Sequence, residues 1–169
     1  MFRSGTVFRP ALAPRALHEN PPHRLCRRPE TGYPDDILRA RAPPHLLSAA
    51  AHLRAIRFTR PGLNEAAIAA ELQHTFHSQH AVASYSPIVG GGANACVLHY
   101  RADTAPIRNG ELVLIDAGCE LDGYASDITR TFPADGRFSD AQRELYELVL
   151  AAQQAAIAAT RPGARKQDA

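Results

Sequence analysis

Two aspartates in the middle of the chain, Asp116 and Asp127, have the residue type and the spacing that metal or acid–base chemistry needs. Each lies in a run of apolar and β-branched residues that is typical of a β-strand, Leu112–Ala117 for the first and Tyr124–Phe132 for the second. Between the runs stands Asp122–Gly123, the dipeptide that best fits a tight type I′ hairpin turn. The sequence therefore predicts one antiparallel hairpin with a carboxylate on each strand.

The register of this hairpin decides whether the two carboxylates meet. If the turn has two residues, Leu121 pairs with Tyr124 and Asp127 lies opposite Gly118. Gly118 shares a face with Asp116, because side chains alternate along a strand. The two aspartates are then diagonal neighbours on one face, with Cβ atoms about 7 Å apart or somewhat less.

Two negative charges in this arrangement need a partner. At about 4 Å in a partly buried setting they repel by roughly 4 kcal/mol, and the loss of hydration adds to that cost. A shared proton would relieve the repulsion, and so would a divalent metal ion that prefers oxygen ligands. The alternative is a surface hairpin whose aspartates face water or cap turns. The four apolar residues before Asp116 favour a buried site, because such a strand is usually covered on both faces.

The segments around these aspartates closely resemble the first two metal-ligand segments of Xaa-Pro aminopeptidases. The two segments are residues 112–120 and 123–133, and the likeness continues upstream through 85–100 and downstream through 142–146. Xaa-Pro aminopeptidases are pita-bread metallopeptidases, as are prolidase, methionine aminopeptidase and creatinase. The resemblance covers roughly residues 45–163.

The resemblance implies a fold and a reaction. The fold is α+β, a partial pita-bread fold with an antiparallel sheet and helices on one face, and residues 45–163 form the first half of its catalytic domain. The reaction releases the N-terminal residue ahead of proline. Two metal ions, Mn²⁺ or alternatively Co²⁺ or Zn²⁺, hold a bridging hydroxide that attacks the peptide carbonyl.

The resemblance also assigns roles to single residues. Asp116 and Asp127 match the two aspartate ligands of the metal ions. His99 matches the histidine that lines the active site and contacts the substrate near the scissile bond. A neutral imidazole at that position could donate a hydrogen bond to the developing oxyanion.

The family uses further ligands that the sequence does not provide. They are a histidine and two glutamates from the second half of the domain, one glutamate acting as general base, and no histidine follows His99 here. We therefore expect a truncated chain that is inactive alone and could be completed by another chain. The alternative is a non-catalytic fragment or pseudo-enzyme, at most a weak metal-binding or interaction module.

Within the family, prolidase is the nearest competitor to Xaa-Pro aminopeptidase. Methionine aminopeptidase fits less well, because Leu98–Tyr100 replaces its usual Cys-His-Gly context. The expected partner is a peptide with proline in second position, and the intact family enzyme suggests a homo-oligomer.

Two helices are predicted ahead of the hairpin. The first, Leu46–Phe58, ends at the helix breaker of residues 60–62, and its apolar side contains Leu46, Leu47, Ala50 and Leu53. Asn64 can cap the second, Glu65–Ser78, and its inner stripe contains Ile68, Leu72, Thr75 and Phe76. At the end of the second helix, His74, His77 and His80 could form a metal cluster, but a solvated helix end is the preferred interpretation.

Two strands are predicted between these helices and the hairpin. Ser84–Val89 is the first, Gly90–Gly92 turns the chain, and Asn94–Tyr100 is the second and carries His99. The glycines lack the Lys-Ser/Thr of a phosphate-binding loop, so backbone crowding explains them better than nucleotide binding. Two of the three cysteines, Cys96 and Cys119, are expected to be small core residues with free thiols.

A long helix is predicted after the hairpin, from Asp140 to about Thr160. Ser139 and Gln142 have the spacing of a capping box, and the apolar stripe contains Leu145, Leu148, Val149, Ala152 and Ala156. Residues 161–163 end the helix and repeat the Arg-Pro-Gly of 60–62. With the resemblance, this repeat suggests that the second of two similar halves begins there, and 164–169 are expected to be a polar tail.

Residues 1–44 are predicted to be an irregular or disordered leader. They contain most of the 13 prolines and an excess of arginine, and few large aliphatic residues. The basic start is a weak indication of organelle import, whereas a leader without function on a cytoplasmic protein is the preferred interpretation. The net charge of +2 does not favour nucleic acid as a partner, and no apolar run is long enough to span a bilayer.

Overall fold

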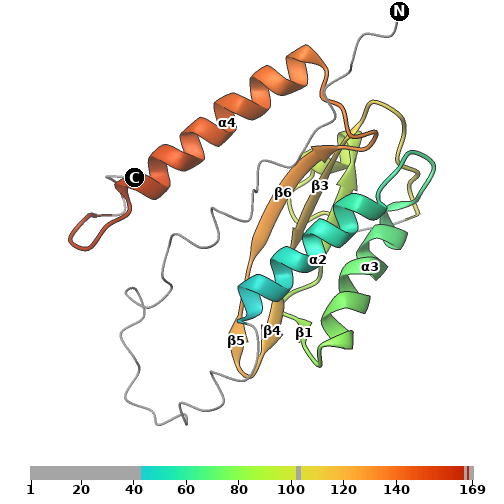
Figure 1. The fold of residues 1–169 in the computed structure, drawn as a ribbon. Coiled ribbons are helices and arrows are strands. Elements are labelled where there is room, and N and C mark those ends of the chain that lie inside the picture. The colour runs from blue at the N-terminus through green and yellow to red at the C-terminus, as the bar shows by residue number, and fades with distance from the viewer. Residues whose placement is uncertain (1–42, 102–103, 166, 168–169) are drawn as a thin grey trace, which may run out of the picture. The chain divides into compact units, whose positions relative to one another are not determined.

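The structure is a computed structural model, and it describes residues 43–101, 104–165 and 167. These residues form two compact units, one that ends at Gly136 and one that begins at Arg137. The first unit contains every helix and strand except the last helix, α4 (Figure 1). The predicted leader lies almost entirely outside the described residues.

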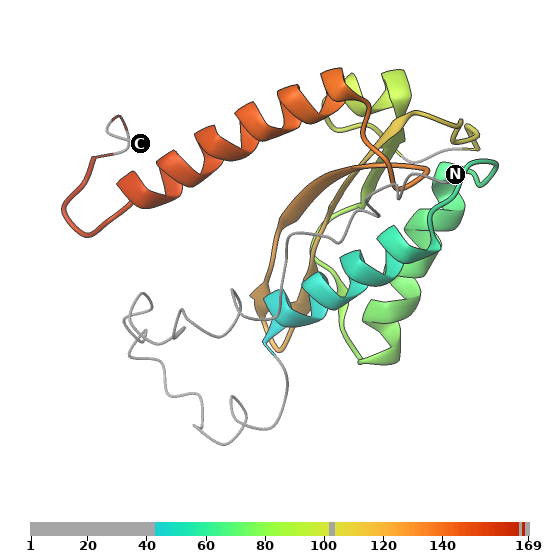
Figure 2. The ribbon, with the colours of Figure 1, turned by 45° about the horizontal axis from the view of Figure 1, so that its top comes forward.

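Two helices open the first unit, as the sequence predicts. α2 spans Pro44–Phe58 and α3 spans Glu65–Ser78, and the two lie side by side (Figure 2). α2 begins two residues before the predicted start, because proline is tolerated in the first turn of a helix, where its missing N–H has no partner to lose. The predicted cap of α3 is confirmed, since the Asn64 side chain accepts a hydrogen bond from the backbone N–H of Ala67 at 2.7 Å.

The buried face of α2 differs from the prediction. Leu46 and Ala50 are exposed, and the buried residues of the helix are Leu47, Ser48, Ala51, His52 and Ala55. The apolar pattern was misleading because two polar residues lie in the buried stripe, where hydrogen bonds satisfy part of their polar groups. The stripe predicted for α3 is confirmed for its large residues Ile68, Leu72 and Phe76.

Within the described residues, six strands form two antiparallel three-stranded sheets. The first sheet has the order β1-β4-β5, and its strands are Val82–Ala83, Cys119–Leu121 and Tyr124–Ala125. The second has the order β2-β3-β6, and its strands are Ile88–Gly91, Leu112–Ala117 and Ile128–Pro133. The predicted hairpin is therefore present, but both of its arms pass from one sheet to the other near Gly118 and Asp127.

The segment before the hairpin differs most from the prediction. The predicted strand Ser84–Val89 begins only at Ile88, after Pro87, and continues through Gly90 and Gly91. Asn94–Tyr100 is not a strand, because the 3₁₀ helix η2 spans Gly92–Cys96 and a turn follows it. Cys96 is consequently exposed, whereas Cys119 is buried as predicted.

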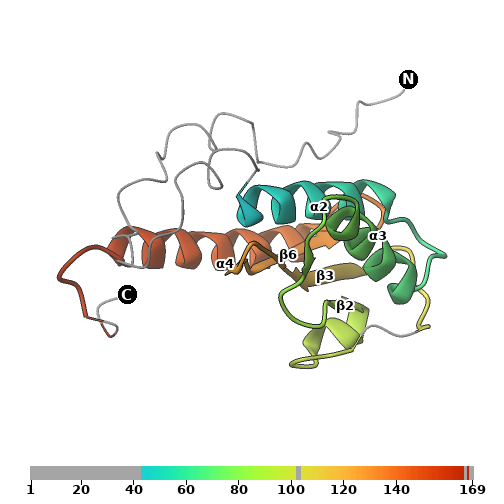
Figure 3. The ribbon, with the colours of Figure 1, turned by 90° about the horizontal axis from the view of Figure 1, so that it is seen from below.

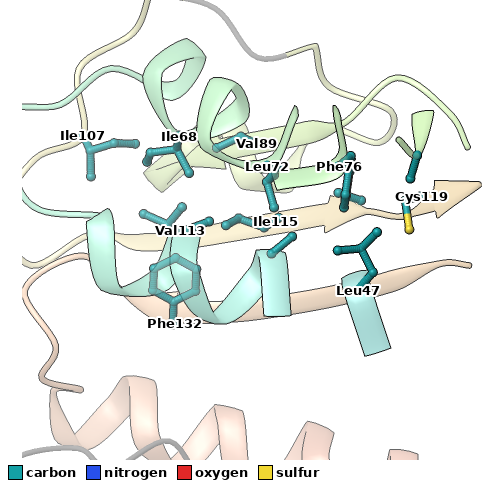
Figure 4. Close-up of a cluster of buried hydrophobic side chains, with 14 of the residues drawn as sticks. Leu47, Ile68, Leu72, Phe76, Val89, Ile107, Val113, Ile115, Cys119 and Phe132 are labelled. Carbon is teal, nitrogen blue, oxygen red and sulfur yellow. The ribbon is translucent and has the colours of Figure 1, made fainter. Parts of the chain in front are cut away.

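The hydrophobic core lies between the two helices and one face of the sheets (Figure 3). Side chains of α3 and of the central strand β3 meet there, among them Ile68, Leu72 and Ile115 (Figure 4). Along β3 the buried residues Val113, Ile115 and Ala117 alternate with half-buried ones. The expected burial of this strand on both faces is therefore wrong for the described residues, because α2 and α3 cover one face only.

The second unit contains one long helix. α4 spans Asp140–Ala159, and the predicted capping box of Ser139 and Gln142 is present. None of the residues of this helix is buried, so its predicted apolar stripe faces solvent. No helix in the described part of the chain is both long and apolar enough to cross a membrane.

Candidate metal centre

The hairpin turn has the predicted type. Asp122 and Gly123 both have positive φ, 54° and 82°, as a type I′ turn requires. Leu121 pairs with Tyr124, which is the predicted register. Glycine tolerates this conformation without cost, and aspartate is among the few residues that adopt it readily.

This register continues without a bulge through both sheets. Beyond the crossing, Ala117 pairs with Ile128 and Asp116 pairs with Thr129. Asp127 thus lies opposite Gly118, and it shares a face of the hairpin with Asp116, as predicted. Asp116 is half-buried and Asp127 is exposed.

A tyrosine hydroxyl joins the two carboxylates. The Oη of Tyr85 lies 2.5 Å from Oδ1 of Asp116 and 2.7 Å from Oδ1 of Asp127. Both carboxylates therefore reach one common atom, which is the geometry that a shared cation needs. Sequence reasoning assigned no role to Tyr85, because the contact joins residues 31 and 42 positions apart and follows no local pattern.

The environment keeps the Tyr85 hydroxyl protonated. Its pKa is raised well above the usual range, first by burial and then by the hydrogen bonds and negative charges of the two neighbouring carboxylates. It can donate its single proton to only one of them at a time. The hydroxyl is therefore a hydrogen-bond donor at neutral pH and relieves part of the repulsion between the aspartates.

Backbone contacts around Gly118 hold the residue next to Asp127. The carbonyl oxygen of Ser126 approaches Gly118 so closely that a Cβ on residue 118 would overlap it. Ser84 links both sides, since its N–H donates to the Gly118 carbonyl at 3.0 Å and its hydroxyl donates to the Ser126 carbonyl at 2.8 Å. These contacts fix the backbone from which the Asp127 side chain extends.

A buried polar cluster connects this backbone to α2. The hydroxyls of Ser48 and Ser126 lie 2.7 Å apart, and the N–H of Cys119 donates to the Ser48 hydroxyl at 2.9 Å. The buried Ser48 thus supports the backbone of the site. A hydrophobic pattern could not predict this role, because serine is polar. The Cys119 thiol donates to the carbonyl of Pro44 at 3.3 Å. Cys119 therefore has a structural role, because it links β4 to the start of α2.

A second buried polar residue of α2, His52, lies one turn further along. Its Nδ1 is 2.8 Å from the carbonyl oxygen of Ser48, so Nδ1 carries the proton in the neutral ring. No hydrogen-bond partner meets Nε2 within the described residues. Burial lowers the pKa of His52, and Arg130 acts in the same direction, whereas the Ser48 carbonyl and Asp116 oppose it.

His99 lies in a different segment from the aspartates, in the loop between β2 and β3. His99 is exposed, and it lies in the turn after η2 with φ 54°. In the described parts of the chain, no hydrogen bond or ion pair joins it to Asp116 or Asp127. Its predicted place in a strand is wrong, because the neighbouring glycines let the backbone fold into a compact loop.

The candidate centre consists of two carboxylates and one hydroxyl. Among the described residues, no group of three or more histidine, cysteine, aspartate or glutamate side chains is placed to hold a metal ion. His74, His77 and His80 at the end of α3 are exposed.

Comparison with protein families and curated proteins gives consistent matches. Residues 45–169 match metallopeptidase family M24. A Xaa-Pro aminopeptidase of Haemophilus influenzae is 51% identical over 118 residues, which cover 69% of this chain and 27% of the relative. The chain thus spans about a quarter of the length of this curated relative.

Solved structures give the same result for the fold. The aminopeptidase PepP of Pseudomonas aeruginosa superposes with a TM-score of 0.70 at 54% identity, over 71% of this chain and 27% of that one. The zinc-substituted aminopeptidase P of Escherichia coli, in complex with product, gives a TM-score of 0.69 at 47% identity, over 71% and 28%. The expected α+β fold, a partial pita-bread fold, is confirmed.

Proposed function

The chain belongs to metallopeptidase family M24, and we propose that it supplies part of the active site of a Xaa-Pro aminopeptidase. The substrate is a peptide with proline in second position, and the reaction releases the residue ahead of that proline. The observation that carries the proposal is the contact of Asp116 and Asp127 with one common atom, the hydroxyl oxygen of Tyr85.

The donor set fits a divalent metal ion of the oxygen-preferring class. Two carboxylates on adjacent strands offer hard oxygen ligands, and a cation between them removes a repulsion that the fold otherwise has to bear. Mn²⁺ is the ion we favour, with Co²⁺ or Zn²⁺ as alternatives, and the zinc-substituted relative supports the alternatives. Divalent ions bound here would polarise the peptide carbonyl and lower the pKa of water.

His99 is the residue we propose as the substrate contact. It is exposed, and no other group of the described residues accepts or donates a hydrogen bond at its ring. A free imidazole N–H of this kind can bind a peptide carbonyl and stabilise negative charge that develops on its oxygen.

The remaining ligands must come from outside these residues. The resemblance implies one histidine and two glutamates more, and no histidine follows His99 in the sequence. We therefore propose that peptidase activity needs polypeptide beyond this stretch, from a longer chain or from a second one. The relatives from Haemophilus influenzae and Escherichia coli are both named Xaa-Pro aminopeptidase, which favours that activity over prolidase.

A second candidate function follows from the small number of metal ligands in the centre. Because two carboxylates are few ligands for a divalent ion, the 169 residues alone would act as a weak metal-binding module without turnover.

Metal titration and a peptidase assay separate these functions. The purified chain is titrated with MnCl₂ by calorimetry and assayed on an Xaa-Pro peptide, together with Asp116→Asn and Asp127→Asn. Each variant should weaken Mn²⁺ binding by about tenfold or more, since one ligand charge is lost. Asp122→Asn is the matched control, because it makes the same change in the exposed turn of the same hairpin.

The outcomes differ clearly. Weak binding that depends on both aspartates, with no turnover, supports an incomplete site. Turnover that either substitution abolishes would show that these residues are sufficient. Binding unaffected by both substitutions would exclude the centre.

A further inference from the structure

We infer that Glu65 is a positioning residue, whose buried carboxyl group holds both ends of the loop 91–100 and thereby fixes His99. The inference rests on the proposed function, because the position of His99 matters to a reaction only if His99 contacts a substrate. Glu65 has an exposed fraction of 0%, and it is the first residue of α3. Glutamate is almost never fully buried without partners, so its partners here are informative.

At least three groups of the loop donate hydrogen bonds to Glu65. The N–H of Gly91 and the side-chain amide of Asn94 donate to Oε1, both at 2.9 Å. The hydroxyl of Tyr100 donates to Oε2 at 2.8 Å. The Asn94 amide also donates to the Tyr100 hydroxyl at 2.9 Å, which closes a ring among the three side chains. The first, middle and last parts of the loop are thus tied to one point on α3.

The same end of α3 holds the chain beyond the loop. The N–H of Glu65 donates to the carbonyl of Ala105 at 3.2 Å, and Asn64 forms a β-bridge with Pro106. The N-terminus of a helix favours a negative charge, so a carboxylate is well placed there. The start of α3 is therefore a rigid base for the loop.

The glycines explain how the loop packs closely enough to be held in this way. A Cβ on Gly90 would lie 2.9 Å from the backbone nitrogen of Ala95, and one on Gly92 would lie 2.7 Å from Oε1 of Glu111. Gly92 also has a positive φ of 54°. At Gly90 the backbone folds back on itself only because a side chain is missing.

His99 lies at the end of this loop in a conformation that needs support. Its φ of 54° is uncommon for a residue with a side chain, and such conformations persist where the surroundings fix them. The turn is closed by the N–H of Tyr100, which donates to the carbonyl of Val97 at 3.2 Å. The next side chain after His99 is that of Tyr100, whose hydroxyl is bound to Glu65. Glu65 therefore holds the backbone from which the His99 imidazole extends.

Amide exchange and imidazole chemical shifts, measured by NMR on the full chain, test the inference. In Glu65→Ala, the amides of Gly91, Val97 and Tyr100 should exchange at least about tenfold faster, since their hydrogen-bonded loop loses its anchor. The amide of Ile115 in β3 is the internal reference. Glu65→Gln should restore most of the protection, because its carbonyl oxygen still accepts from Gly91.

Two further variants show whether the changes come from the hydrogen bonds between Glu65 and the loop. Glu71→Gln is the matched control, because Glu71 lies on the same helix and pairs only at the surface with Arg54, at 2.6 Å. It should change neither the loop amides nor His99. Tyr100→Phe removes one hydroxyl, and it should accelerate exchange of the Tyr100 amide severalfold, because the hydroxyl no longer donates to Glu65.

The His99 signal provides the readout that a merely structural role would not move. The tripeptide Ala-Pro-Ala, added at constant ZnCl₂ as a diamagnetic ion, should shift the His99 imidazole beyond the shift that ZnCl₂ alone causes, and this additional shift should be severalfold smaller in Glu65→Ala. No additional shift in the unaltered chain would contradict His99 as the substrate contact, while the amide rates would still decide the role of Glu65.

The inference is overturned if the loop amides and the His99 signal are unchanged in Glu65→Ala. If that variant unfolds, so that Ile115 also loses protection, Tyr100→Phe decides. Faster exchange of the Tyr100 amide, together with a smaller peptide-induced shift of His99, then supports the inference, and an unchanged rate and an unchanged shift overturn it.

Discussion

At the scale of single residues, the candidate centre depends on a balance between two negative charges and one hydroxyl. The carboxylates of Asp116 and Asp127 both contact Tyr85, whose raised pKa keeps its proton in place. The hydroxyl removes part of the repulsion, and a cation would remove more. Stability and metal binding are therefore coupled at this point.

Tyr85→Phe tests the coupling. Without metal the substitution should lower the free energy of unfolding by about 1–3 kcal/mol, because two carboxylates lose a hydrogen-bond donor. With excess MnCl₂ the loss should be smaller, since the cation compensates the charges. Urea unfolding with and without MnCl₂ measures both values, and Tyr124→Phe, at an exposed tyrosine of the same hairpin, is the control. A loss for Tyr85→Phe that is the same with and without MnCl₂ would contradict the coupling.

His52 gives the fold a dependence on pH. Burial lowers the pKa of His52 below the value near 6.5 of an unfolded chain. Between the two values the unfolded state binds more protons, so stability is full above about pH 6.5 and falls as the pH falls, by at most about 1.4 kcal/mol per unit. Unfolding measured from pH 7.5 to 5 should show this slope.

The slope should be reduced in His52→Leu and retained in His77→Gln, which changes an exposed histidine. A slope that is the same in both variants would assign the pH dependence to other groups.

The sequence alone predicted that the two aspartates share a face of the hairpin. It did not predict the contacts of Tyr85 and Glu65. A two-residue turn fixes the register of a hairpin locally, so the shared face of Asp116 and Asp127 follows from counting along the chain. Tyr85 and Glu65 act through contacts with residues at least 26 positions away. No periodicity reports such contacts, because they depend on how the elements pack.

At the scale of elements, the sequence predicted the helices and the hairpin but not the buried face of α2 or the conformation of the loop 91–100. Helix caps and breakers are local, so the bounds of α3 and α4 were accurate. The face of α2 was not, because Ser48 and His52 are buried for their hydrogen bonds. The loop contains residues that suit a strand, yet the anchor at Glu65 and the glycines impose a 3₁₀ helix and a turn.

The crossing of the hairpin between the two sheets leads to a prediction for Gly118→Ala. The new Cβ would overlap the Ser126 carbonyl, so the backbone beside Asp127 must move. The free energy of unfolding should fall by about 1–3 kcal/mol, as for an overpacked core, and Mn²⁺ binding should weaken as well.

Gly62→Ala is the control for this substitution. Its Cβ meets nothing within 4 Å, and only the positive φ of 93° is unfavourable. It should cost about 1–2 kcal/mol of stability by its backbone conformation and leave Mn²⁺ binding unchanged. Unaltered Mn²⁺ binding in Gly118→Ala would show that the crossing does not set the position of Asp127.

At the scale of the whole molecule, one face of the central strand β3 is only partly covered by the described residues. Leu112 and Leu114 lie on the face of β3 that carries Asp116, and both are only half-buried. The chain matches about 27% of the length of its relatives, so most of their polypeptide has no counterpart in these residues. Cooperative stability should accordingly reside in the first unit, where helices and sheets share a core.

This distribution of stability leads to a prediction for α4. None of its 20 residues is buried, and Leu148 is 67% exposed. The helix is maintained by local contacts, namely its backbone hydrogen bonds, its capping box and the packing of Phe138 on Tyr146 and Arg143. An isolated helix of this length is marginally stable in water. Native-state amide exchange should therefore give α4 opening free energies of about 0–2 kcal/mol, well below those of β3.

A urea series separates local opening of α4 from global unfolding, because α4 should open locally while the β3 amides exchange only with global unfolding. Ser139→Ala, which removes the helix cap, should accelerate exchange in α4 alone. Equal protection of α4 and β3 in a dilute, monomeric sample would show instead that the exposed stripe is covered and that the chain unfolds as one cooperative body.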